Sequence, residues 1–190
     1  MRATGPMTSE ALAHPEGGLS VRPTRELDLP AVADIYGHHV LHGTASFELE
    51  PPGVEEMTRR WKDINEGGYT HLVAVSAGTV VGYAYASAYR PRPAYWFTVE
   101  DSIYIRTGSE RRGIGRSLLG ALIGECSIRG FHRMVAVIGD NSPASIALHV
   151  QAGFDLVGTL KSVGYKFGAW RDVTLMQRPL ESRSDAANDL

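Results

Sequence analysis

The sequence lacks the features that mark secreted, membrane-spanning or nucleic-acid-binding chains. It has 190 residues and one cysteine, Cys126, so an internal disulfide cannot form. It contains no run of about 18 apolar residues, the length that a membrane-spanning helix needs. Its formal net charge is -2, which gives no general attraction to nucleic acid or to anionic membranes. We therefore expect a cytoplasmic protein that binds neither membranes nor nucleic acids.

What remains is the composition of an ordinary globular domain. Hydrophobic residues make up 43% of the chain and charged residues 21%, and the length is enough for one domain with a substantial core. The opening residues 1–18 have no apolar segment of the secretory type and are rich in small and polar residues, which predicts a flexible leader. Residues 181–190 are similarly polar and predict a flexible tail. We expect one folded domain over residues 19–180.

Apolar periodicity and turn residues predict the element order β-α-α-β-β-β-α-β-α-β-β. Helices are expected over residues 28–43, with Asp28 as N-cap, over 51–68 and over 142–153. A hairpin is expected over 70–89, and two strands around a turn-rich insert over 155–180. This order predicts an α/β (α+β) fold, with a mixed sheet of about seven strands flanked by about four helices.

A loop rich in glycine and arginine precedes another predicted helix. Gly113 and Gly115 remove side chains where a ligand could approach the backbone, and Arg111, Arg112 and Arg116 add positive charge. The first turn of a helix also leaves amide N–H groups unpaired and carries a partial positive charge. Neither the dinucleotide motif nor the P-loop motif fits the loop. It is therefore either an anion-binding site or a basic, solvated helix start whose glycines serve only a turn.

The loop resembles the CoA-binding motif of the GNAT superfamily of N-acetyltransferases, [QR]-x-x-G-x-[GA] between a strand and a helix. The matching residues are Glu110-Arg111-Arg112-Gly113-Ile114-Gly115, and Glu110 stands where Gln or Arg is usual. The order of elements is also similar to that superfamily over nearly all of residues 19–180. The resemblance implies the GNAT fold and acetyl-CoA as co-substrate.

Four separated blocks carry a closer resemblance, to the phosphinothricin and methionine sulfone acetyltransferase subfamily. They are "IYGHHVLHGTASFELEPP", "AYWFTVEDSIYI", "VAVIGDNSPASIALH" and "GYKFGAWRDVTLMQ". The resemblance implies transfer of an acetyl group to the α-amine of a small amino-acid-like substrate, such as phosphinothricin, methionine sulfone or methionine sulfoximine. It also implies a homodimer.

The same resemblance assigns residues to the cofactor. The backbone of Ile103, Tyr104 and Ile105 is expected to pair with the amides of the pantetheine arm as an added strand would. Asn141 or Ser142, before the last helix, is expected to contact CoA. The pyrophosphate is expected on the N–H groups of the loop and helix start, that is on Arg111, Arg112, Gly113, Ile114, Gly115 and Arg116.

Two residues are expected to move protons. Only the free amine attacks a thioester, so a base is needed, and the resemblance places Glu100 beside the amine; its alternative is a solvated strand acid. His149 is expected to give a proton to the departing thiolate or to hydrogen-bond the cofactor sulfur. The alternative for His149 is a surface histidine on a helix.

The acceptor amino acid needs groups for its carboxylate and side chain. Arginine gives carboxylates a bidentate contact, and Pro91 stiffens the loop that carries Arg90 and Arg92. Strand alternation directs Asp101 away from the face of Glu100. Lys166, Trp170 and Arg171 are candidates for closing the site, from the same chain or a partner subunit, and Tyr95 and Trp96 for lining it. The expected acceptor-binding residues are Phe47, Arg90, Pro91, Arg92, Glu100, Asp101 and Ser102.

Other interpretations stay open. His38, His39 and His42 suggest a metal, but no H-E-x-x-H pattern or cysteine partner accompanies them, so we expect no metal site. A second function on the same fold is acetylation of another amine, such as a polyamine or a peptide N-terminus. A third is an acyl-CoA-binding sensor without catalysis, which would tolerate loss of Glu100.

Overall fold

The computed structural model describes residues 18–180, so the expected leader and tail lie outside the described residues except for residue 18. Short 3-10 turns, Glu26–Asp28 and Pro93–Tyr95, precede α1 and β4. No helix within 18–180 is long and apolar enough to cross a membrane. The helices are α1 (Leu29–His42), α2 (Val54–Glu66), α3 (Ile114–Ile128) and α4 (Pro143–Gln151). The strands are β1 (Leu19–Pro23), β2 (His71–Ser76), β3 (Thr79–Ala88), β4 (Thr98–Ile105), β5 (Arg133–Gly139), β6 (Asp155–Lys166) and β7 (Ala169–Pro179).

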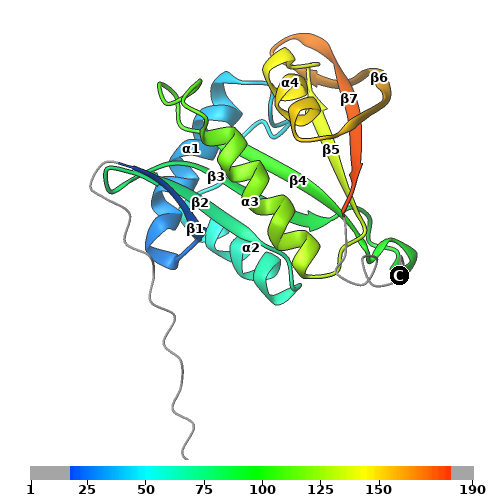
Figure 1. Ribbon diagram of the computed structural model, residues 1–190. Helices are drawn as coiled ribbons and strands as arrows, with labels where there is room; N and C mark the ends of the chain where they lie inside the picture. The colour runs from blue at the N-terminus through cyan, green and yellow to red at the C-terminus, as the bar shows by residue number, and fades with distance from the viewer. Residues whose placement is uncertain (1–17, 181–190) are drawn as a thin grey trace, which may run out of the picture.

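The strands form one seven-stranded mixed sheet in the order β1-β2-β3-β4-β5-β7-β6. Every neighbouring pair is antiparallel except β4 and β5, which are parallel and are joined by α3. The expected parallel crossover is therefore confirmed, as is the predicted fold of seven strands and four α-helices. The glycine loop lies at the end of β4, where the crossover begins (Figure 1).

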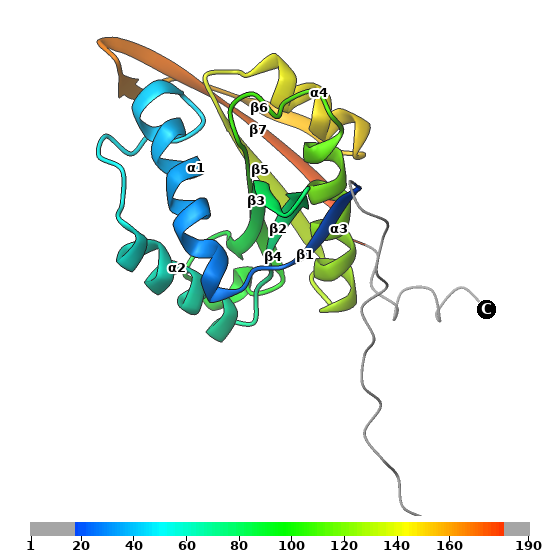
Figure 2. The same cartoon turned by 90° about the vertical axis from the view of Figure 1, so that its left-hand side faces the viewer.

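Helices cover both faces of the sheet. In Figure 2, α1 and α2 lie on one side of the sheet and α3 and α4 on the other. Strand alternation divides the core accordingly. Tyr83 and Tyr104 pack with α1 and α2, whereas Ala84 and Ala86 pack with α3. A side chain's place in the strand therefore decides which of two chemically different cores it joins.

The parallel pair β4 and β5 stays together over only part of its length. Paired residues run from Thr98 with Arg133 to Asp101 with Ala136, and β4 then continues to Ile105 with β3 on its other side. The two strands diverge from a common lower end in Figure 1. A fork is left in the sheet, and the beginning of α3 lies at its open end.

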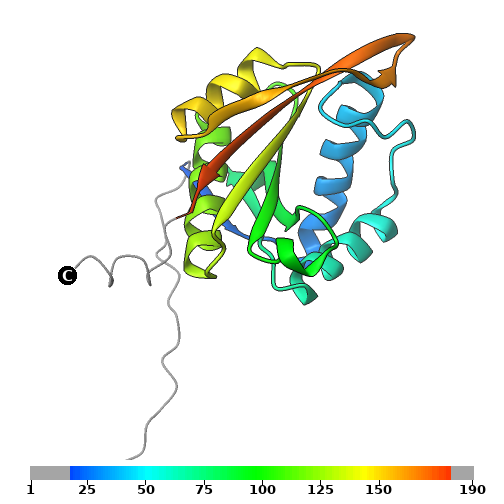
Figure 3. The ribbon, with the colours of Figure 1, turned by 90° about the vertical axis from the view of Figure 1, so that its right-hand side faces the viewer.

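The C-terminal hairpin differs from the expectation. No turn-rich insert separates β6 from β7, because the two strands pair up to Lys166 and Ala169 across the tight turn Phe167–Gly168. Gly158 and Gly164 lie within β6, and the pairing shifts at Leu156/Gly158 and at Leu160/Gly164. The end of the hairpin reaches past the C-terminal end of α1 (Figures 2 and 3).

Asp28 occupies the expected N-cap position of α1, but its side chain does not cap the helix. Instead its carboxylate accepts hydrogen bonds from Arg22 Nη1 at 2.6 Å and Nη2 at 2.8 Å, and a third from the backbone N of Arg25. The bidentate contact with Arg22 lowers the pKa of Asp28. The buried acid therefore fastens β1 to the start of α1.

Candidate active site

The glycine loop turns sharply into α3. Gly113 is the N-cap of α3 with φ of 79°, and Arg111 has φ of 60°. This left-handed region suits glycine, because a side chain there is strained. The N–H groups of the first helical turn have no acceptor within the helix, so they remain available for an anion.

The second glycine of the motif has a different role. A Cβ at Gly115 would lie 3.2 Å from Leu148 Cδ2, so Gly115 lets α3 approach α4. The arginines also differ from one another. Arg116 Nη2 donates to Gln151 Oε1 at 2.7 Å, whereas exposed Arg111 and Arg112 form no ion pair with any residue in 18–180. The loop thus has both a packing function and an anion-binding geometry, and its CoA contacts stay a prediction.

The predicted cofactor strand lies at the fork. Ile103 and Ile105 pack toward α3, and Tyr104 is buried against Tyr36 on the opposite face, with ring centroids 5.0 Å apart. One carbonyl is already occupied, since His39 Nε2 donates to Ile105 O at 2.8 Å. The edge of β4 beyond Asp101 is where a pantetheine arm could pair as a strand, which remains an expectation.

Glu100 is half-buried on the face of the sheet that α1 and α2 cover. It lies opposite Ser87 of β3. The next residue of the strand, Asp101, points to the other face of the sheet. Burial raises the pKa of Glu100, the charge of Arg90 opposes this shift, and the net pKa stays above the ordinary value. A carboxylate with a raised pKa is suited to accept a proton near neutral pH. These properties favour a base over a solvated strand acid.

His149 is buried on the cofactor side, not on the surface. Its Nδ1–H donates to Ser145 O at 2.7 Å, and its Nε2 lies 3.0 Å from Asp101 Oδ2. Burial alone would lower the pKa of His149. The hydrogen bond and charge of Asp101, together with the Ser145 contact, outweigh burial, so the net pKa is raised above the ordinary value of 6.5. The surface-histidine alternative is wrong, since only 3% of His149 is exposed. Its role toward the thiolate stays a prediction.

Both candidates for contact with CoA in the turn before α4 form hydrogen bonds with other residues of this chain. Ser142 is the N-cap of α4, and its Oγ accepts from Ser145 N at 3.4 Å. Asn141, with φ of 49°, donates to Asp172 and accepts from Thr174 Oγ1 at 2.6 Å. Asn141 is thus tied to β7 and Ser142 to α4, and either contact with CoA stays a prediction.

The loop between β3 and β4 is exposed. Arg90 lies over the Tyr89 ring, 4.5 Å from its centroid, and neither Arg90 nor Arg92 forms an ion pair with a described residue. Tyr95 and Trp96 are 42% and 65% exposed, so this chain alone does not enclose a pocket with them. Pro91 lies in the same loop, whereas Ser102 lies within β4 opposite Tyr85 of β3. Asp101 is buried beside His149 on the other face of the sheet. Their binding to the acceptor stays a prediction.

The segment that follows α1 packs against the end of the β6–β7 hairpin. Phe47 packs so closely on Gly164 that a Cβ there would lie 2.5 Å from the Phe47 ring. Lys166 is 2% exposed, and its Nζ donates to Ser46 O at 2.6 Å. Trp170 is exposed beside Tyr165. Arg171 Nη1 instead binds Asp140 Oδ2 at 3.0 Å.

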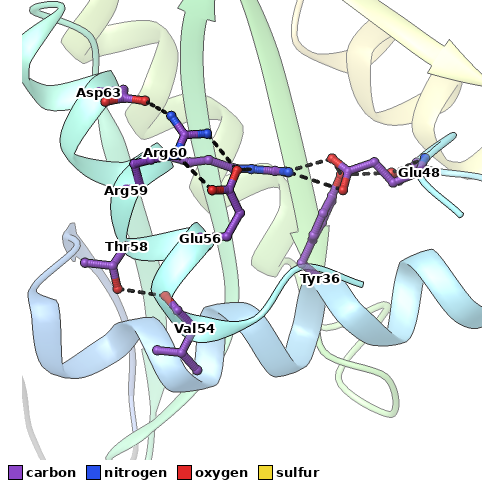
Figure 4. A network of polar contacts seen from close by, with 9 residues as sticks. Tyr36, Glu48, Val54, Glu56, Thr58, Arg59, Arg60 and Asp63 are labelled. Carbon is purple, nitrogen blue, oxygen red and sulfur yellow. Dashed lines mark hydrogen bonds and ion pairs between the residues drawn. The ribbon is translucent and has the colours of Figure 1, made fainter. Parts of the chain in front are cut away.

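Sequence reasoning missed a polar network between α1 and α2 (Figure 4). Tyr36 donates to Glu48 Oε1 at 2.9 Å, and Arg60 binds Glu48 at 2.7 Å and Glu56 at 2.8 Å. Burial is the main cause that raises the pKa of Tyr36 to about 12. The spacing of Glu56 and Arg60 was a visible signal for a helical pair, but the link to Glu48 was not.

The histidines of α1 separate in the structure. His38 packs against His42, with ring centroids 4.7 Å apart, while His39 turns to Ile105. Within residues 18–180 no three His, Cys, Asp or Glu side chains gather as metal ligands would. Cys126 is fully buried, and burial raises its pKa to about 12, as an inert core thiol requires.

Comparison with known proteins settles the family. The family model described as "Acetyltransferase (GNAT) domain" matches residues 21–175. The chain belongs to the GNAT acetyltransferase family. It is an acetyl-CoA-dependent N-acetyltransferase, as the motif Glu110–Gly115 predicted.

Individual relatives extend over most of the chain. It is 49% identical over 164 residues to a phosphinothricin N-acetyltransferase of Alcaligenes faecalis, covering 86% of this chain and 83% of the relative. It is 38% identical to an L-methionine sulfoximine/L-methionine sulfone acetyltransferase of Pseudomonas paraeruginosa, covering 88% and 98%. The crystal structure of a Sinorhizobium meliloti phosphinothricin acetyltransferase with acetyl-CoA superposes with a TM-score of 0.85 and 45% identity, covering 87% and 91%.

Proposed function

We propose that this GNAT enzyme acetylates the α-amine of a small amino acid with a polar, oxygen-bearing side chain. Methionine sulfone, methionine sulfoximine and phosphinothricin represent this class. The relatives with these substrates in their names support the proposal over the whole length of the domain. The single observation that carries it is Glu100, a half-buried acid with a raised pKa on the face opposite the anion-binding helix start.

The geometry supports a direct transfer. Glu100 takes a proton from the ammonium group, and the amine lone pair then attacks the thioester carbonyl carbon. The nitrogen of the tetrahedral intermediate releases its extra proton to solvent, and the intermediate collapses to the amide with cleavage of the C–S bond. The departing CoA thiolate takes up a proton, for which His149 is the candidate donor. Arg90 and Arg92 bind the carboxylate of the acceptor through ion pairs. The start of α3 and the edge of β4 hold the cofactor.

The homodimer belongs to the same proposal. β6 is an edge strand of the sheet, and an exposed apolar edge strand tends to find a partner. Lys166, at the end of the hairpin, is bound to Ser46 in the segment that carries Phe47. Size-exclusion chromatography with light scattering should give twice the chain mass of 20.6 kDa. The exposed apolar residues of the hairpin are Leu156, Val157, Leu160, Val163, Tyr165, Phe167 and Trp170.

A CoA-release assay over a panel of amines tests the function. The panel contains methionine sulfone, methionine sulfoximine, phosphinothricin, unmodified methionine, spermidine and a short peptide with a free N-terminus. We expect turnover on the first three and little on spermidine or peptide. Preference for spermidine or peptide would overturn the substrate class. Acetyl-CoA binding without turnover of any amine would instead identify a sensor.

A further inference from the structure

The edge of β4 that faces the fork presents a defined set of backbone groups. Arg106 N donates to Val81 O at 2.9 Å, and the register of β3 with β4 is regular, so every second residue before Arg106 turns its N–H and C=O toward β3. The residues between them turn these groups toward β5. The pairing of β4 with β5 ends at Asp101. Beyond it, Ile103 and Ile105 direct their backbone groups into the open fork.

His39, in the last turn of α1, occupies one of these groups. Its Nε2 lies 2.8 Å from Ile105 O, and because a carbonyl oxygen can only accept, Nε2 carries the proton. The His39 ring also packs against Tyr104, with centroids 5.4 Å apart, on the face of the sheet that Glu100 shares. Among the residues that the structure describes, the N–H and C=O of Ile103 and the N–H of Ile105 are then left without a strand partner.

The chain just after α1 contacts the other arm of the fork. Thr44 O lies so close to Gly139, the last residue of β5, that a Cβ at this position would overlap it. A glycine there gives the two backbones room to touch. Ser46 O accepts from the Nζ of buried Lys166 at 2.6 Å, which ties the same segment to β6. Residues 39–46 thus join β4 to β5 and β6 across the open end of the fork.

This connection is important because the fork has little other support. β4 and β5 share four residue pairs, all at the closed end, and α3 begins at the open end. A pantetheine arm can pair as a strand only if the free groups of β4 keep their direction and the gap keeps its width. An edge that is already ordered lowers the entropic cost of binding. The contacts of residues 39–46 on both arms meet these conditions.

We propose that residues 39–46 brace the fork for the pantetheine arm, and that His39 is the positioning residue that orients the end of β4. The inference goes beyond the acceptor class and rests, within the proposed function, on the expected pairing of pantetheine with Ile103–Ile105. By holding Ile105 O, His39 keeps this edge aimed at the arm, so that the thioester lies beside Glu100. His39 takes no part in the proton transfers.

Two substitutions of His39 test its role. His39→Leu removes the donor, whereas His39→Gln keeps an N–H group of similar reach. Calorimetric titration should give a Kd for acetyl-CoA about three- to tenfold higher in His39→Leu, because binding must then order an edge that one hydrogen bond had held, and a Kd close to wild type in His39→Gln. His38→Leu is the matched control, because exposed His38 packs against His42 on the same helix, and it should leave the Kd unchanged.

A ligand without the arm separates positioning from a general effect on the fold. The probe 3′-phosphoadenosine 5′-diphosphate carries the nucleotide of CoA but no pantetheine, so its Kd should be the same in wild type and His39→Leu. Equal weakening of both ligands would show that His39 only supports the fold. An unchanged Kd for acetyl-CoA would show that His39 does nothing for the arm. Either result would overturn the proposal.

A variant on the other arm tests the brace without changing His39. Gly139→Ala places a methyl group against Thr44 O, so it should raise the Kd for acetyl-CoA several-fold and leave the Kd for the nucleotide probe unchanged. Gly158→Ala, in β6 with nothing within 4 Å of a Cβ, is the control and should change neither Kd. A wild-type Kd for acetyl-CoA in Gly139→Ala would refute the brace.

These titrations need no acceptor, which keeps the inference separate from the proposed function. If wild type acetylates no amine of the panel, the proposed function fails, while the two Kd values still decide the role of His39. In active enzyme, His39→Leu should raise KM for acetyl-CoA and leave KM for the acceptor amine at the wild-type value. A rise in KM for the amine alone would overturn the assignment of His39 to the cofactor.

Discussion

The two faces of the sheet differ in how their buried polar side chains are hydrogen-bonded. On the face covered by α3 and α4, the buried polar pair of Asp101 and His149 is hydrogen-bonded, and small residues such as Ala84 let the helix lie close. On the face covered by α1 and α2, Tyr83 is buried, its hydroxyl has no hydrogen-bond partner within residues 18–180, and Glu100 has a raised pKa. We expect the first face to bind the cofactor through backbone groups and the second to recognise the acceptor through side chains.

Removing the acid of the acceptor face should have the largest effect. Glu100→Gln should lower kcat about 10²–10⁴-fold, because positioned proton transfer contributes that much. Only ionised Glu100 accepts a proton, so wild-type kcat/KM should fall as pH drops through its raised pKa, and the variant should lack this limb. CoA-release kinetics from pH 5 to 9 measure both. Glu125→Gln, at a partly exposed acid of α3, is the control. An unchanged rate in Glu100→Gln would assign the base elsewhere.

Acid should weaken the acceptor face through His71. Burial lowers its native pKa to about 4, whereas the unfolded chain titrates near 6.5, so the unfolded state binds the proton first. Stability is then lost as pH falls, by about 3 kcal/mol between pH 7 and pH 4. Urea unfolding of wild type, His71→Gln and the exposed-histidine control His42→Gln isolates this contribution. An equal pH dependence in wild type and His71→Gln would contradict it.

The Asp101–His149 ion pair should have the opposite pH dependence, because its contribution to stability is lost as pH rises. His149 has a raised native pKa, so its protonated form stabilises the fold below about pH 6.5, and this contribution is lost as pH rises through the raised value. Asp101→Asn should therefore cost about 2 kcal/mol at pH 6 and less at pH 9. Urea unfolding at the two pH values measures it. A penalty independent of pH would show that Asp101 acts only through packing.

The smallest effect is expected at the start of α3. Gly113→Ala places a side chain at φ of 79°, which should cost about 1–2 kcal/mol and raise KM for acetyl-CoA. Gly120, inside the same helix and with nothing within 4 Å of a Cβ, provides the control. Gly120→Ala should raise stability by about 0.5–1 kcal/mol and leave KM unchanged. Similar effects of the two variants would mean that the left-handed turn is unimportant for the cofactor.

The cofactor face was the more predictable from sequence. Gly113 and the helix after it are local in the chain, and Cys126 follows from helical periodicity. The network of Tyr36, Glu48 and Arg60 joins three segments through long side chains, so no local pattern reports it. The expected turn-rich insert within residues 155–180 is absent, because β6 pairs with β7 and accommodates its irregular stretches by shifts in register.

The fork between β4 and β5 has a mechanical consequence. The blocks β1–β4 and β5–β7 share a seam of four residue pairs, from Thr98 with Arg133 to Asp101 with Ala136. A pantetheine chain paired with Ile103–Ile105 would extend the contact between β4 and β5 and would link the two blocks of the sheet more rigidly. Cofactor binding and rigidity would then be coupled, and we expect amide hydrogen exchange at Ile103–Ile105 to slow when acetyl-CoA is present.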